Sequence, residues 1–175
     1  ILSDFKYIFF WEYLHRMLGR LLGIVFLIPF IYFIFMKKLS KRLIVQSTIL
    51  LIMGASQGAI GWWMVKSGLV DRPDVSHFRL AIHLTTAFLT CSYTFWIALS
   101  LIMPTSIKGN KSVFNLLLIL LFLVLTQIVY GAFVAGLKAG KIYNSWPKMG
   151  NEWMPESVLL DAGAGAQFIH RILAL

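Results

Sequence analysis

Four long apolar runs, separated by short polar connections, dominate the pattern of the chain. They cover about residues 17–36, 43–65, 80–103 and 113–137, and each is close to the roughly 20 residues that a helix needs to cross a bilayer core. A fifth apolar run opens near Ala164 and reaches Leu175, the last residue. The pattern therefore predicts an all-α transmembrane protein with about four and a half spans.

Composition supports a membrane protein. Of the 175 residues, 59% are hydrophobic and 13% are charged, and the mean hydropathy is +0.79, whereas a soluble domain has about 45–50% apolar and about 25% charged residues. The only cysteine, Cys91, lies in the middle of a predicted span, so no disulfide forms within the chain. Because the first residue is Ile1 and the fifth run is short, we expect the sequence to be part of a longer protein.

The net charge of +9 comes from basic residues in the connections between spans. Lys37, Lys38, Lys41 and Arg42 crowd one connection, and Lys108 and Lys111 lie two spans later. The positive-inside rule explains this pattern, so we expect lipid and no nucleic acid as the surroundings. These connections then face the cytoplasm or the mitochondrial matrix. All acidic residues fall on the opposite, outer side: Asp4, Glu12, Asp71, Asp74, Glu152, Glu156 and Asp161.

The chain also contains an internal repeat of two spans. Gln57 is followed by Gly61 near the end of the second run, and Gln127 is followed by Gly131 near the end of the fourth. The pair His-Arg opens the first run at His15 and the fifth at His170. A Gln/Gly helix therefore alternates with a His helix. For the glycines alone, close packing of helices on small residues is the competing explanation.

Three histidines, His15, His83 and His170, stand at the outer ends of the odd-numbered spans. Two helices that each present a histidine at a matched depth can hold one metal from opposite sides. Haem iron with axial imidazoles suits such a pair better than zinc, which takes about four protein ligands in structural sites. Gly19 and Gly23 follow His15 on one helix face and leave room for a flat ligand. Interhelical hydrogen bonding is the alternative role of these histidines.

Glu12 stands three residues before His15, on nearly the same helix face. It could orient the imidazole, transfer a proton or act beside a substrate; a plain ion pair with Arg16 is the alternative. Four arginines suit the carboxylates of a haem, because a guanidinium binds carboxylates in a forked geometry. They are Arg16, Arg20, Arg79 and Arg171. Reaching out to the membrane surface is the competing role for Arg79.

A long outer connection, residues 143–155, follows the fourth run and is rich in turn-forming residues. Its tryptophans, Trp146 and Trp153, fit an aromatic belt at the membrane interface. The alternative is a loop that covers an outward-facing site.

Several motifs together resemble haem A synthase, in the form found in mitochondria and alphaproteobacteria. They are Glu12-Tyr13-Leu14-His15-Arg16, the stretch from Gly61 to Leu69 (GWWMVKSGL), Arg79-Leu80-Ala81-Ile82-His83-Leu84, Asn144-Ser145-Trp146-Pro147-Lys148-Met149 and Phe168-Ile169-His170-Arg171.

The resemblance implies eight helices in two pseudo-symmetric four-helix bundles, with haem sites towards the outer face. Residues 1–104 would form most of the first half, without its first helix, and residues 105–175 the beginning of the second. It implies a multi-pass protein of the bacterial plasma membrane or mitochondrial inner membrane. The implied reaction oxidises the methyl group of haem O to the formyl group of haem A by successive oxygen-dependent hydroxylations, for terminal oxidase.

For the site, the resemblance implies that His15 and His83 ligate the substrate haem, that Glu12 assists turnover and that His170 ligates a haem b that passes electrons. Gln167 stands where Glu12 stands in the first copy, so we predict the chemistry at the His15 copy. Haem O synthase, an electron donor and a second copy of the chain are the further partners expected. A di-haem cytochrome b that only carries electrons is the main rival, and a haem transporter or a scaffold without cofactor is a weaker one.

Overall fold

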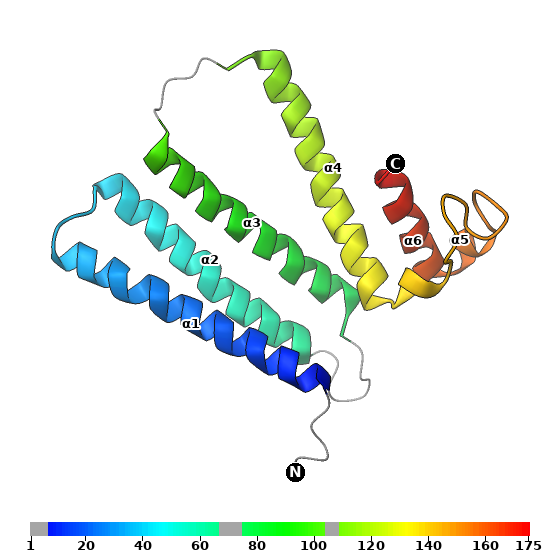
Figure 1. The fold of residues 1–175 in the computed structure, drawn as a ribbon, viewed down its shortest axis with the longest axis horizontal. Coiled ribbons are helices and arrows are strands. Elements are labelled where there is room, and N and C mark those ends of the chain that lie inside the picture. The colour runs from blue at the N-terminus through cyan, green and yellow to red at the C-terminus, as the bar shows by residue number, and fades with distance from the viewer. Residues whose placement is uncertain (1–6, 67–74, 104–108) are drawn as a thin grey trace, which may run out of the picture. The chain divides into compact units, whose positions relative to one another are not determined.

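The computed structural model describes residues 7–66, 75–103 and 109–175, and it is helical nearly throughout (Figure 1). Within these ranges the extended structure is limited to an isolated bridge between Met149 and Glu152. The fold is therefore the predicted all-α membrane fold. Its helices are α1 (Tyr7–Phe35), α2 (Lys41–Lys66), α3 (His77–Ile102), α4 (Lys111–Gly136), the 3₁₀ turn η1 (Ala139–Lys141), α5 (Ser157–Leu160) and α6 (Ala162–Leu173).

The helices α1 to α4 are long and apolar enough to cross a membrane, which confirms the four predicted spans. Three of them begin and end within three residues of the apolar runs. The prediction that the first span begins at about residue 17 is wrong, because α1 is already helical from Tyr7. Its first turns hold aromatic and charged side chains, which lower hydropathy without disfavouring a helix. His15 consequently lies inside α1, roughly two turns past its start.

Local signals in the sequence set the helix ends. Ser40 precedes α2 and its Oγ accepts a hydrogen bond from the Leu43 amide at 3.2 Å. Asn110 caps α4 through the Ser112 amide at 2.8 Å, and Asp161 caps α6 through the Ala164 amide at 2.7 Å. Such side chains satisfy the amides that the first helical turn leaves without partners.

Few side chains of the spans are fully buried inside the chain. In the most apolar window of each of the four, at most 6% of residues are buried inside the chain. Several of their hydroxyl groups bond within the helix: Thr86, Thr90 and Thr94 each donate to the carbonyl four residues earlier, at 2.7–2.8 Å. This arrangement satisfies polar groups that would otherwise lie unpaired in lipid.

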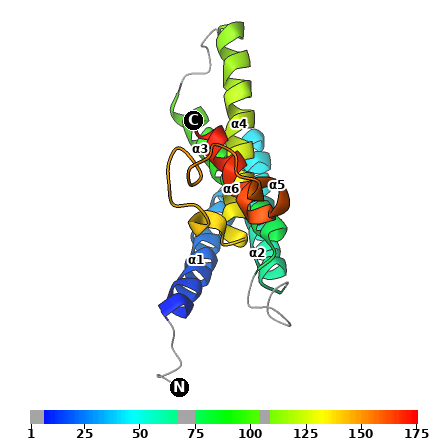
Figure 2. The same cartoon turned by 90° about the vertical axis from the view of Figure 1, so that its right-hand side faces the viewer.

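The chain divides into two compact units. The first extends to Gly58 and contains α1 and most of α2; the second begins at Ala59. In the second unit α6 runs along the C-terminal half of α4 (Figures 1 and 2). The residues buried there are small, which allows the two helices to approach closely. They include Ala132, Ala139, Ala164 and Ala166.

Some residues used in the sequence predictions lie outside the described ranges. They are Asp4, Asp71, Asp74 and Lys108, on which the orientation partly depends, and Ser67, Gly68 and Leu69 of one family motif. The orientation of the spans and the division into halves at residue 104 stay predictions.

Candidate functional site

The imidazole of His170 lies directly against Gly131 of α4. A β-carbon built on Gly131 would be 3.1 Å from Cε1 of His170, 3.6 Å from Nδ1 and 3.7 Å from Nε2. Such a distance is tighter than nearly all real contacts of a β-carbon. A side chain at this position would therefore require the ring of His170 to move by a few tenths of an ångström.

The same arrangement recurs between Gly61 at the end of α2 and His83 of α3. A β-carbon on Gly61 would be 3.1 Å from Cε1 of His83 and 3.6 Å from both ring nitrogens. The structure thus pairs a Gln/Gly helix with a His helix twice within the second unit. Two of the three predicted ligands thus have their imidazole rings against a glycine of the repeat, and we call this contact a glycine seat. It is a more specific role for the glycines than general helix packing.

Further polar groups surround His170. The Gln127 side chain donates from Nε2 to the His170 carbonyl oxygen at 3.0 Å. The Oε1 atom of Gln127 and the Nδ1 atom of His170 are both buried, and neither has a hydrogen-bond partner among the described residues. The ring of His170 therefore rests against a glycine, and its backbone carbonyl is held by Gln127. Its Nδ1 atom has no hydrogen-bond partner among the described residues.

Gln167 fastens the outer connection to α6. The side chain is only 3% exposed. Its Oε1 accepts from the Tyr143 amide at 3.2 Å, while Nε2 donates to the carbonyls of Tyr143 at 3.0 Å and Gly140 at 3.3 Å. The position that carries a carboxylate in the first copy of the repeat, at Glu12, thus holds a loop anchor in the second.

The two predicted carboxylate-binding arginines of the second unit make protein contacts. Arg171 donates to the carbonyl oxygens of Ser145, at 2.7 Å, and of Tyr143. Arg79 donates to the Trp63 carbonyl oxygen at 2.8 Å, and its guanidinium carbon lies 4.3 Å from the centre of the Trp63 ring. Both guanidinium groups are therefore held in place by backbone, with further donors left over.

In the first unit, Glu12 and Arg16 form an ion pair one helical turn apart on α1. Both side chains are about half exposed, at 43% and 51%. This pair is the alternative role weighed for Glu12, although an ion pair does not exclude proton transfer. Arg20 is 3.6 Å from the sulfur of Met17. His15 is exposed, and its pairing with His83 stays a prediction.

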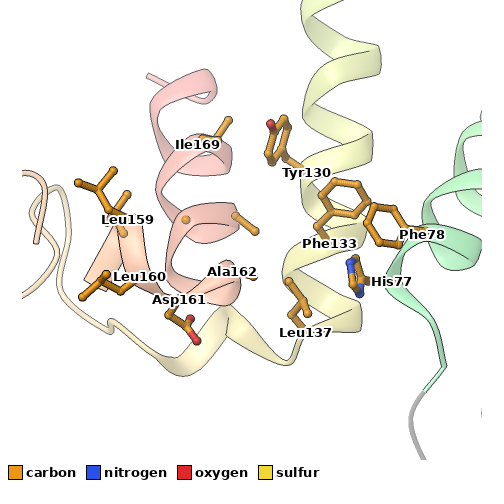
Figure 3. Close-up of a pocket in the computed structure, with 13 residues that line it drawn as sticks. His77, Phe78, Tyr130, Phe133, Leu137, Leu159, Leu160, Asp161, Ala162 and Ile169 are labelled. Carbon is orange, nitrogen blue, oxygen red and sulfur yellow. The ribbon is translucent and has the colours of Figure 1, made fainter. Parts of the chain in front are cut away.

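A cavity of about 520 Å³ lies in the second unit, beside the start of α3 and the end of α4 (Figure 3). Its walls are mainly apolar side chains of α3, α4, α5 and α6 and of the segment that follows α4, including Phe133, Leu137 and Ile169. His77, the first residue of α3, lies edge-on to Phe133 with the ring centres 5.4 Å apart. His77 is thus part of an aromatic cluster.

Among the described residues, no three histidine, cysteine or acidic side chains lie close enough together to hold a metal ion. The candidate ligands are single imidazoles on separate helices. A metal bound here needs further donors, which a porphyrin supplies.

Comparison with known proteins decides the family. The sequence profile of the COX15-CtaA family, described as "Cytochrome oxidase assembly protein", matches residues 1–175. The chain belongs to the COX15-CtaA family.

Relatives in this family carry the name expected from the resemblance. The chain is 50% identical to "Heme A synthase" of Flavobacterium psychrophilum, over 99% of this chain and 54% of that protein. It is 42% identical to "Heme A synthase" of Wolbachia pipientis, over 99% and 53%. It is 43% identical to "Heme A synthase COX15" of Arabidopsis thaliana, over 99% and 43%. The chain thus spans about half the length of these relatives. No solved structure is significantly similar to it.

Within this COX15-CtaA chain, sequence reasoning found the histidines and missed the roles of two glutamines. Gln127 was visible as part of the repeat, but its bond to His170 was not predicted. Gln167 was noted only for lacking a carboxylate. Its amide pairs with a loop far along the chain, and spacing alone carries no signal for such a contact.

Proposed function

We propose that the protein containing this chain is a membrane-bound haem A synthase, an oxidoreductase that converts the methyl group of haem O to the formyl group of haem A with molecular oxygen. The observation that carries the proposal is the duplicated seat of His83 on Gly61 and of His170 on Gly131. Duplication fits two haem sites, one for substrate and one for electron transfer. The names of the relatives support the same reaction.

The surroundings of His170 support its proposed role as a ligand of haem b. Its ring rests on a glycine, and its buried Nδ1 has no hydrogen-bond partner among the described residues. A histidine that binds iron through one ring nitrogen usually donates a hydrogen bond from the other nitrogen. The Nδ1 atom of His170 is available for such a bond, which suits the role of a haem ligand. When bound, haem b would supply one-electron transfer.

Within the proposal, His15 and His83 orient haem O from the two helices of the first half. Glu12 supplies a proton-transferring carboxylate beside it. The guanidinium of Arg16 holds Oε1 of Glu12, so Oε2 is the oxygen that can exchange protons. Haem propionates would be bound by Arg16, Arg20, Arg79 and Arg171, the last two through donors that their backbone contacts leave over.

The remaining parts of the proposal concern surroundings and partners. We assign the protein to the bacterial plasma membrane or the mitochondrial inner membrane, with the histidine ends of the helices outward. Haem O synthase would deliver substrate, an electron donor would reduce the site, and copies of the protein would associate.

The decisive experiment extracts the pigments of membranes that contain the full-length protein, supplied with haem O and oxygen. A haem A synthase accumulates hydroxylated and formyl haem. Recovery of haem b and unchanged haem O alone would reject the enzyme in favour of a di-haem cytochrome b.

A further inference from the structure

We propose that Gln127 is a positioning residue for His170: its Oε1 accepts a hydrogen bond from Nδ1–H of the imidazole when Nε2 binds iron. The inference rests on the proposed function only in taking His170 as a haem ligand. Helix α4 would then have two roles at His170: Gly131 contacts the ring, and Gln127 orients it.

Gln127 already binds the residue that it would orient. Its Nε2 lies 3.0 Å from the carbonyl oxygen of His170. Gln127 and Gly131 are four residues apart and therefore share one face of α4, and Gly131 is the residue against which the ring rests. The carboxamide thus stands one helical turn from the imidazole contact.

Each of the two groups has a buried atom whose hydrogen bond is missing. Gln127 Oε1 is an acceptor and His170 Nδ1 can be a donor, and neither is satisfied by the described residues. Coordination through Nε2 requires the proton on Nδ1, and histidine ligands almost always donate that proton to a nearby acceptor. The terminal torsion of a glutamine is soft, so Oε1 can turn towards the ring.

Other polar side chains near His170 are committed elsewhere or have the wrong chemistry. The Gln167 amide is occupied by Gly140 and Tyr143. Arg171 carries only donors and is bound to the carbonyls of Tyr143 and Ser145. Of the side chains that bond to α6 from α4, Gln127 is the one with an available acceptor.

The test compares Gln127→Leu with Gln127→Glu in the full-length protein loaded with haem b. Both remove the neutral amide, but glutamate keeps a stronger acceptor. A hydrogen bond to Nδ1–H makes the imidazole more basic and stabilises ferric iron. We expect Gln127→Leu to raise the midpoint potential and to weaken haem binding about 10-fold or more, and Gln127→Glu to lower the potential.

The control is Thr126→Val, whose lost hydroxyl bonds only to Phe122 of its own helix, and it should leave the potential unchanged. Potentials that move in the same direction in both Gln127 variants, or in neither, would overturn the inference. If Gln127→Leu fails to fold, Gln127→Ala takes its place, with the same expected rise in midpoint potential, and no rise would overturn the inference. Loss of the low-spin signal in His170→Ala establishes the haem site separately. If that signal persists, the proposed ligand is wrong, whatever the Gln127 variants do.

Discussion

Gly131 and His170 are in such close contact that a β-carbon on the glycine would lie 3.1 Å from the imidazole Cε1, so the ring would have to shift to admit a side chain. Gly61 and His83 repeat the relationship. A helix that carries glycine at this point lets the neighbouring helix bring its histidine ring against the backbone.

Gly131→Ala should disturb His170 without unfolding the protein. The added methyl forces the ring to shift, and overpacking of this kind costs about 1–3 kcal/mol. We expect weaker haem binding and a reduced low-spin absorption in the full-length protein. Gly140→Ala is the matched control, because its β-carbon would meet only Val134 at 3.8 Å. Equal spectra for both variants would argue against the seat.

Gln167→Leu should loosen the outer connection. The substitution leaves the amide and carbonyl groups of Tyr143, which is partly buried, and the carbonyl of the exposed Gly140 without their partner. A fully buried group left unpaired costs about 1–3 kcal/mol, so the cost here is at or below the lower end of that range. We expect a lower unfolding temperature and faster protease cleavage between residues 143 and 155. Asn151→Ala changes an exposed residue of the same connection and should leave both quantities as in wild type. Resistance to protease in Gln167→Leu would show that other contacts hold the loop.

Arg171→Lys should have a similar but smaller effect. A lysine keeps the charge but cannot span the carbonyls of Tyr143 and Ser145 in the way the planar guanidinium does. Proteolysis of the same connection measures the loss. If haem affinity falls while the loop stays resistant, Arg171 acts mainly on the haem carboxylates, as the sequence predicts.

Glu12→Ala should leave haem binding largely intact and reduce product formation by about 10²–10⁴-fold, the usual contribution of a general acid or base. Loss of the exposed ion pair with Arg16 by itself should cost only about 0.3–0.5 kcal/mol of stability. Product formation is measured from extracted haems. Arg16→Gln separates the two roles: if both variants retain wild-type turnover, Glu12 is only the partner of Arg16.

Much of the fold could be predicted from the sequence because membrane spans depend on one dominant quantity, the length of apolar runs. The start of α1 could not, since Trp11, Glu12 and His15 lower hydropathy yet remain helical. The repeated spacing of Gln and Gly predicted that a Gln/Gly helix alternates with a His helix, but it did not specify the Gly–His contacts. The anchoring of Tyr143 by Gln167 and Arg171 was not, because it depends on the path of a connection that has no periodicity.

The central claim is that His83 and His170, whose rings rest on glycines, are haem ligands. Absorption spectra of His83→Ala and His170→Ala test this claim most directly. In the purified full-length protein, supplied with haem O and haem b, we predict that each variant loses a different low-spin haem signal while the other signal remains. Retention of both signals in both variants would contradict the assignment of these histidines as haem ligands.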